Sequence, residues 1–88
     1  MNEKLQANII PILHNYKSPN HMLKGNNMIL QRLGYKNYPE LSLAFCQGVV
    51  FSEIVTQVDL HCYPHPPDEK TMIEATELFL SFIRGEFE

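Results

Sequence analysis

The first residues of the chain alternate between apolar and polar positions with a helical period. Apolar side chains between residues 3 and 16 recur mostly three or four positions apart: Leu5, Ile9, Ile12, Leu13 and Tyr16. This spacing predicts a helix with one apolar face. Pro11 conflicts with it, because a proline inside a helix removes a hydrogen bond and clashes with the preceding turn. We therefore expect either a kink at Pro11 or a helix that starts near Asn8, with Pro11 in its first turn.

A second helix is predicted over residues 21–33, after a turn at Ser18-Pro19-Asn20. Asn20 is a suitable N-cap, since its side chain can accept a hydrogen bond from a free backbone N–H of the first turn. Gly25, Asn26 and Asn27 weaken the middle of this helix. Gly34 is a natural stop, because glycine readily takes the left-handed conformation that ends helices.

Residues 39–62 allow two interpretations. Pro39-Glu40 followed by Leu41, Ala44 and Phe45 has helical spacing. From residue 53 onward, however, apolar and polar side chains alternate, with Ile54, Thr56, Val58, Leu60 and Cys62 on one side. Alternation with period two in β-branched residues predicts a strand.

A strand needs a partner, and the preceding residues can supply one. If Gln47-Gly48 forms a two-residue turn, Phe45 lies opposite Val50 and Leu41 lies opposite Ile54. Most large apolar side chains of both strands then share one face, which is the register that a half-buried hairpin requires. We therefore prefer a β-hairpin here to a continuous helix.

The last element has the clearest pattern. Asp68 is placed to cap a helix over residues 69–84, and Arg84-Gly85 ends it. Its broad apolar stripe consists of Met72, Ala75, Thr76, Phe79, Phe82 and Ile83. The predicted fold class is α+β, a single domain over residues 1–88 in which two N-terminal helices precede a hairpin or small antiparallel sheet, with the C-terminal helix packed on it. The alternative is an all-α bundle in which residues 39–58 form one long helix.

Composition narrows the functional classes. The 88 residues are 44% hydrophobic and 19% charged, which is ordinary for a globular domain. We expect a cytoplasmic protein, because no uninterrupted apolar run is long enough for a membrane span and the N-terminus lacks the features of a signal peptide. Cys46 and Cys62 are expected to be free thiols, mostly buried, rather than a disulfide.

Charge is distributed unevenly along the chain. Residues 1–38 hold five basic residues and one acidic one, and residues 39–88 hold two basic and nine acidic ones, so the halves carry +4 and −7. The preferred interpretation is that the two halves pack together and neutralise each other. The alternative is a nucleic-acid-binding regulator that uses the basic segment 14–38. Its contact residues would be Lys17, Lys24, Arg32 and Lys36. Nucleic acid is the less favoured partner, because the chain is net acidic and DNA-binding domains usually carry a strong basic field.

Metal-ligand chemistry is concentrated in His61, Cys62 and His65. Imidazole and thiolate bind zinc, but structural zinc sites usually have four ligands. On the predicted strand His61 and Cys62 point in opposite directions, so an inward cysteine beside exposed histidines is the preferred interpretation and a small metal-binding protein the alternative. The same divergence argues against a cysteine nucleophile. With no phosphate-binding glycine motif either, we expect no catalysis, no cofactor and no metal.

The apolar residues exceed what so small a core needs. Val49-Val50-Phe51 and the aromatic C-terminal end predict some exposed contact surface. The candidate contact residues are Val49, Phe51, Val55, Phe82 and Phe87. The function predicted from the sequence is therefore a non-catalytic protein–protein interaction module, such as a small inhibitor, adaptor, immunity-type protein or regulatory subunit. Its partner is another protein or a second copy of the chain in a homodimer, with no membrane involved.

Overall fold

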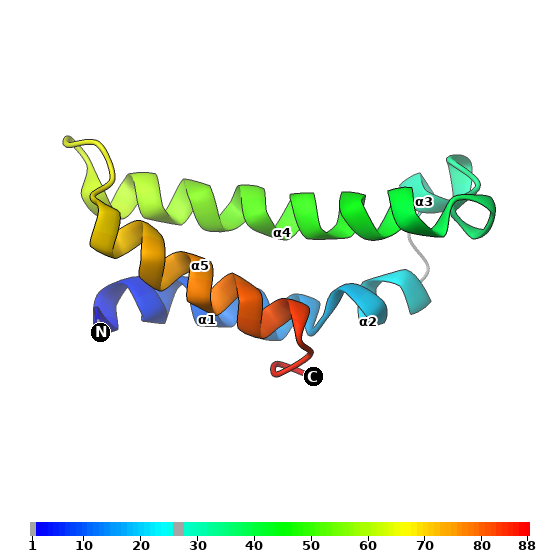
Figure 1. Ribbon diagram of the computed structural model, residues 1–88, viewed down its shortest axis with the longest axis horizontal. Helices are drawn as coiled ribbons and strands as arrows, with labels where there is room; N and C mark the ends of the chain where they lie inside the picture. Colours follow the sequence, from blue (N-terminus) through cyan, green and yellow to red (C-terminus); the bar gives the residue numbers. More distant parts are fainter. Residues whose placement is uncertain (1, 26–27) are drawn as a thin grey trace.

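A computed structural model describes residues 2–25 and 28–88, and these residues form helices joined by turns (Figure 1). The first helix, α1 (Glu3–Tyr16), begins at the start of the predicted range and continues through Pro11. The Asn2 side chain caps it by accepting a hydrogen bond from the backbone N–H of Leu5 at 3.3 Å. Leu5, Ile9 and Leu13 are fully buried along one face. Of the two alternatives, a start near Asn8 is therefore wrong.

The second helix predicted over residues 21–33 is also wrong, because two shorter helices take its place. Helix α2 (Pro19–Lys24) starts earlier, since Pro19 occupies its first position and Ser18, not Asn20, caps it. The Ser18 hydroxyl accepts a hydrogen bond from the backbone N–H of His21 at 3.0 Å. Gly25 then turns to an extended conformation (φ −74°, ψ 162°), which ends the helix. Asn26 and Asn27 lie outside the described residues.

Helix α3 (Met28–Arg32) and a short 3₁₀ turn η1 (Tyr35–Asn37) complete this part of the chain. Gly34 between them has the left-handed conformation expected of a helix stop, with φ 66°. Lys24, Arg32 and Lys36 are all exposed on these short elements. They lie at one end of the molecule, beside the start of the next helix (Figure 1).

The predicted hairpin is wrong, and with it the α+β fold class. Residues 39–62 form one helix, α4 (Pro39–Cys62), and no strand occurs among the residues that the structure describes. Gln47-Gly48, the expected turn, lies in the middle of this helix. The fold is all-helical, as in the alternative arrangement with residues 39–58 in one long helix.

Packing explains why the helix wins over the local β preference. Every fourth residue of α4 is buried, and this row consists of Ser42, Cys46, Val50, Ile54 and Val58. The row packs on α1, α2 and α5. Because four is a multiple of two, Ile54 and Val58 fit an alternating strand as well as a helix face, so the sequence pattern alone was ambiguous.

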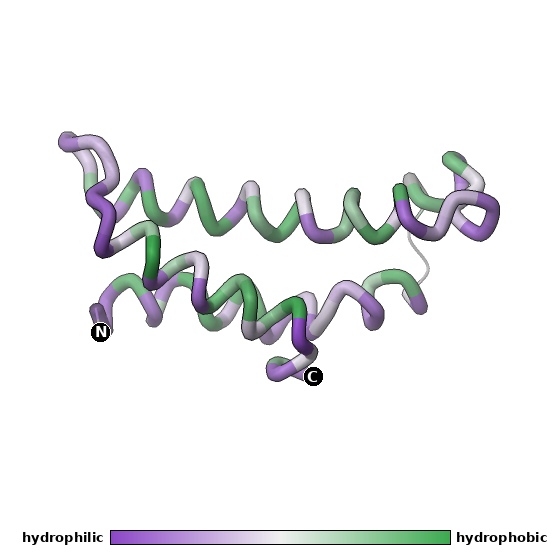
Figure 2. The backbone as a smooth tube through the Cα atoms, viewed as in Figure 1, coloured by the Kyte–Doolittle hydropathy of each residue, from purple (hydrophilic) through white to green (hydrophobic). Residues whose placement is uncertain are grey.

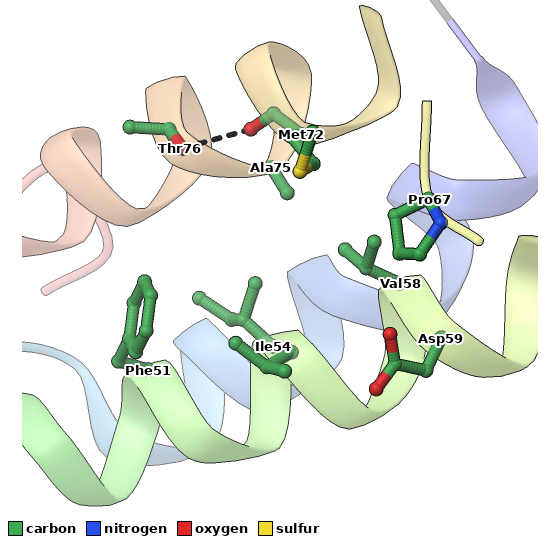
Figure 3. Close-up of a pocket in the computed structure, with 9 residues that line it drawn as sticks. Phe51, Ile54, Val58, Asp59, Pro67, Met72, Ala75 and Thr76 are labelled. Carbon is green, nitrogen blue, oxygen red and sulfur yellow. Dashed lines mark hydrogen bonds between the residues drawn. The ribbon is translucent and has the colours of Figure 1, made fainter. Parts of the chain in front are cut away.

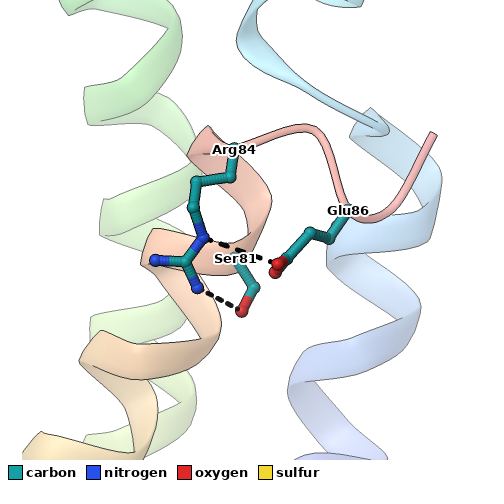
Figure 4. A network of polar contacts seen from close by, with 3 residues as sticks. All are labelled: Ser81, Arg84 and Glu86. Atoms are coloured by element: carbon teal, nitrogen blue, oxygen red, sulfur yellow. Dashed lines mark hydrogen bonds and ion pairs between the residues drawn. The ribbon is translucent and has the colours of Figure 1, made fainter.

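The last helix, α5 (Glu69–Ile83), confirms the predicted position and cap, but Met72 and Thr76 of the predicted stripe are exposed. The buried residues of this helix are Thr71, Glu74, Ala75, Leu78 and Phe82. Asp68 caps it by accepting a hydrogen bond from the backbone N–H of Thr71 at 2.9 Å. At the other end, Arg84 donates to the Ser81 hydroxyl at 3.3 Å and pairs with Glu86 at 3.5 Å, all on the surface (Figure 4). This is the single ion pair within the described part of the chain, so the expected neutralisation of the two halves does not occur through direct pairs there.

The helices run lengthwise in a molecule that measures 41 × 24 × 17 Å. Helix α4 spans most of its length, and α1 and α5 lie along one side of it in the opposite direction (Figure 1). The core fills the space between them, around Phe82, Leu5, Ile9 and Val50. No helix of the described residues lies over the opposite side of α4 (Figure 1), and Figure 2 shows hydrophobic residues along the whole length of this helix, with hydrophilic ones between them.

Candidate interaction surface on the long helix

The solvent side of α4 carries large apolar side chains. Leu41, Phe51, Val55 and Leu60 are 65%, 48%, 39% and 65% exposed. Between residues 41 and 58 the helix has a single charged residue, Glu53. Glu53 is exposed, and it lies near Tyr16 of α1, where burial of the phenol, followed by the hydrogen bond and negative charge of Glu53, raises the pKa of Tyr16. The one charge on this stretch of α4 therefore lies on the side toward α1.

Five exposed positions of α4 follow a heptad pattern, with spacings of three, four, three and four residues. They are Leu41, Ala44, Gly48, Phe51 and Val55, and we call them the α4 seam. Apolar residues at such spacing form the narrow contact line along which two helices pack in coiled coils. The seam is distinct from the buried row, which faces α1 and α5. Helix α4 thus has two apolar faces, and its own fold covers one of them.

Gly48 in this seam has no role in the packing of the monomer. A Cβ atom added there would meet no heavy atom within 4 Å, and its φ is not positive. Glycine inside a helix costs about 1 kcal/mol relative to alanine. Neither a turn nor a close intramolecular contact offsets that cost at Gly48.

A groove of about 180 Å³ borders the seam, between α4 and α5 (Figure 3). Its walls are almost entirely apolar: Phe51, Ile54, Val55, Val58, Pro67, Met72, Ala75 and Thr76, with Asp59 at one end. Phe51 closes the other end, where its ring meets Phe79 edge-on at 5.4 Å between centroids. The Thr76 hydroxyl donates to the Met72 carbonyl at 2.7 Å, so it is engaged within α5. A groove of this size accepts one large apolar side chain, since about 150 Å³ holds a benzene ring.

The contact residues predicted from the sequence divide into two groups. Val49, Phe51 and Val55 lie on the exposed side of α4, with Val49 half-buried. Phe82 is fully buried in the core. Phe87 is partly buried, with its ring edge-on to His14 at 5.1 Å, next to the hydrogen bond from Ser18 to Glu88. Leu41, Ala44 and Gly48 were missed, although their heptad spacing is visible once residues 39–62 are read as a helix.

The basic residues proposed for nucleic acid do not share one helix. Lys24, Arg32 and Lys36 are exposed at one end of the molecule, whereas Lys17 lies between α1 and α2. The helix expected to carry them is divided, and its two parts have six and five residues. Binding of nucleic acid at these residues stays a prediction.

The His61, Cys62 and His65 cluster does not have the expected strand geometry, because His61 and Cys62 end α4. Among the described residues, no three histidine, cysteine, aspartate or glutamate side chains gather closely enough to hold a metal ion. His61 Nε2 lies 2.8 Å from the Asn2 amide nitrogen. Cys46 is buried, and burial raises the pKa of its thiol, which opposes formation of a nucleophilic thiolate at this position.

Helix α4 is also long and apolar enough, by length and composition alone, to cross a membrane, and 28% of its most apolar 18 residues are buried. Core helices of globular proteins meet the same criterion. The expected cytoplasmic location therefore stays a prediction.

Comparison with known proteins adds no relative, since no family model, curated protein or solved structure matches this chain.

Proposed function

We propose that this protein is a non-catalytic interaction module that binds an apolar helix of another protein chain along the α4 seam. The observation that carries the proposal is the uncharged, exposed apolar line from Leu41 to Val55. An apolar helix face is normally buried. Here the second apolar face of α4 is open to solvent, so a partner chain would complete its burial.

The groove beside the seam supports the same use. Helix-binding surfaces typically combine a flat apolar strip with a pocket that receives one anchoring side chain. The strip is the α4 seam, and the pocket is the groove between α4 and α5. Asp59 at the end of the groove is its single ionisable group, which suits orientation of a bound chain better than acid–base chemistry.

The test compares the wild-type protein with Gly48→Glu, each tagged and recovered from its native cell at physiological salt. The substitution puts a charge into the middle of the seam, while the open space at Gly48 lets the fold persist. The matched control is Thr56→Glu, which adds the same charge to an exposed position of α4 outside the seam.

We expect one protein, including an untagged copy of this chain, to be recovered stoichiometrically with the wild type and with Thr56→Glu, and at least about tenfold less with Gly48→Glu. Equal recovery with all three proteins would overturn the proposal. So would binding of the purified protein to phospholipid vesicles that Gly48→Glu abolishes, because the apolar side would then serve a membrane surface.

A further inference from the structure

The two ends of the molecule carry opposite charge. Residues 20–40, at the end formed by α2, α3, η1 and the start of α4, hold Lys24, Arg32 and Lys36 against Glu40, a net charge of +2. Residues 59–70, at the other end, hold Asp59, Asp68 and Glu69 against Lys70, a net charge of −2. Helix α4 connects these ends, and the α4 seam lies between them (Figure 1).

We propose that the chain bound along the α4 seam is a second copy of this protein, packed antiparallel so that the basic end of each copy lies on the acidic end of the other. This inference rests on the proposed function and specifies its partner. A parallel pair would instead bring the two +2 ends together and the two −2 ends together. Complementary charge fixes the direction of association even where it adds little affinity.

The side chains of the seam fit this arrangement. A two-fold axis between Gly48 and Phe51 places Gly48 opposite Phe51 of the second copy, and Ala44 opposite Val55 of the second copy. Small residues therefore face large ones, which allows the two backbones to approach closely. The contact is self-complementary, as a two-fold dimer requires, and it gives the glycine at residue 48 a purpose that the monomer lacks.

The same register uses the groove. Leu41, which is 65% exposed, comes to the level of Val58 of the second copy, a nearly buried residue that lines the groove. By symmetry the leucine of each copy lies at the groove of the other. In each copy the anchoring residue is thus a leucine that the monomer leaves in water.

The dimensions of the molecule allow an extended contact between two copies. Residues 41–58 extend over about 27 Å of helix, and the end contacts continue along most of the 41 Å length of the molecule. Its long sides measure 41 × 24 Å and 41 × 17 Å. These dimensions are compatible with the roughly 800 Å² that each partner buries in a specific interface of standard size.

The first test is sedimentation velocity of the purified protein from micromolar to submillimolar concentration. We expect a dimer for the wild type and for Thr56→Glu, and at least a hundredfold weaker association for Gly48→Glu, because two carboxylates would meet near the two-fold axis. Replacing Arg32 and Lys36 together by glutamine should weaken the dimer about two- to fivefold for each attraction that is lost between a basic residue and the acidic end of the other copy.

The second test fixes the direction by cross-linking in a Cys62→Ser background. We expect a short bis-maleimide to join Ala44→Cys to Val55→Cys when the two variants are mixed, since residues 44 and 55 face each other in the antiparallel pair. Cross-linking of Ala44→Cys to itself, with none in the mixture, would show a parallel dimer and overturn the inference.

Failure of this inference is distinguishable from failure of the proposed function. A purified protein that stays monomeric, while another protein is still recovered from cells by the wild type and lost with Gly48→Glu, overturns the homodimer and leaves the interaction surface. A monomer with no partner sensitive to Gly48→Glu overturns both.

Discussion

At the scale of single residues, Gly48 shows most directly that the monomer and the proposed assembly place different demands on the sequence. Its position in the middle of α4 favours almost any other residue, and the space around it is open. A residue that costs stability in isolation is expected where another backbone approaches closely. Within the monomer, the same position is therefore one where stability can be gained.

We predict that Gly48→Ala increases the stability of the monomer by about 0.5–1 kcal/mol, the difference in helix propensity between the two residues. Urea unfolding monitored by circular dichroism, at concentrations low enough to keep the protein monomeric, measures this change. A decrease in stability would show that something contacts Gly48 within the monomer. The control is Ala44→Gly, at an exposed position one turn earlier, which should lower stability by a similar amount.

At the scale of elements, the two helices with strong local signals were predictable and the long one was not. Asp68 and its apolar stripe located α5 within one residue. The spacing of Leu5, Ile9 and Leu13 located α1, even with Pro11 inside it. Both helices are amphipathic, so their sequence pattern has a helical period and predicts only a helix.

The pattern of helix α4 is compatible with more than one structure, because this helix is apolar on two sides. Its buried row has a spacing of four, which an alternating strand also satisfies, and its β-branched residues favour the strand locally. Contacts with α1 and α5, distant in sequence, decide between the two. The sequence also does not show which apolar residues these contacts bury. Phe51 and Val55 are exposed as predicted, whereas Phe82, also predicted as a contact residue, belongs to the core.

The cap of α5 gives a prediction for pH. Hydrogen bonds from the side chain and backbone of Thr71 lower the pKa of Asp68 below its ordinary value of 3.8. The carboxylate therefore stabilises the fold fully above the unfolded value, and this contribution is lost as pH falls through the lower, folded value. Asparagine also caps helices but does not titrate in this range.

We accordingly expect Asp68→Asn to remove part of the acid destabilisation of the wild type between about pH 4 and pH 2, the range below the ordinary carboxyl pKa. Thermal unfolding across this range measures the difference, with Asp59→Asn as the matched control at an exposed carboxylate. Identical pH profiles for Asp68→Asn and the wild type would mean that the cap contributes nothing through its charge.

At the scale of the whole molecule, one small core supports a fold whose longest helix is half unpaired. The core connects α1, α4 and α5 around Phe82, and a domain of this size has a net stability of about 5–10 kcal/mol. The exposed seam contributes little to that stability, because its side chains remain largely in water. Stability and association should therefore respond to different substitutions on the same molecule.

We predict that Phe82→Ala costs about 3–5 kcal/mol, since it empties the centre of the core, whereas Val55→Ala changes monomer stability by less than about 1 kcal/mol. Chemical unfolding measures the stability of both variants, and sedimentation measures the loss of association expected for Val55→Ala. If Val55→Ala instead destabilised the monomer as strongly as Phe82→Ala, α4 would be held by its outer side even in isolation, and that side would belong to the core of the monomer rather than to an interface. Weakened association with unchanged stability is the pattern that separates a docking face from a core face.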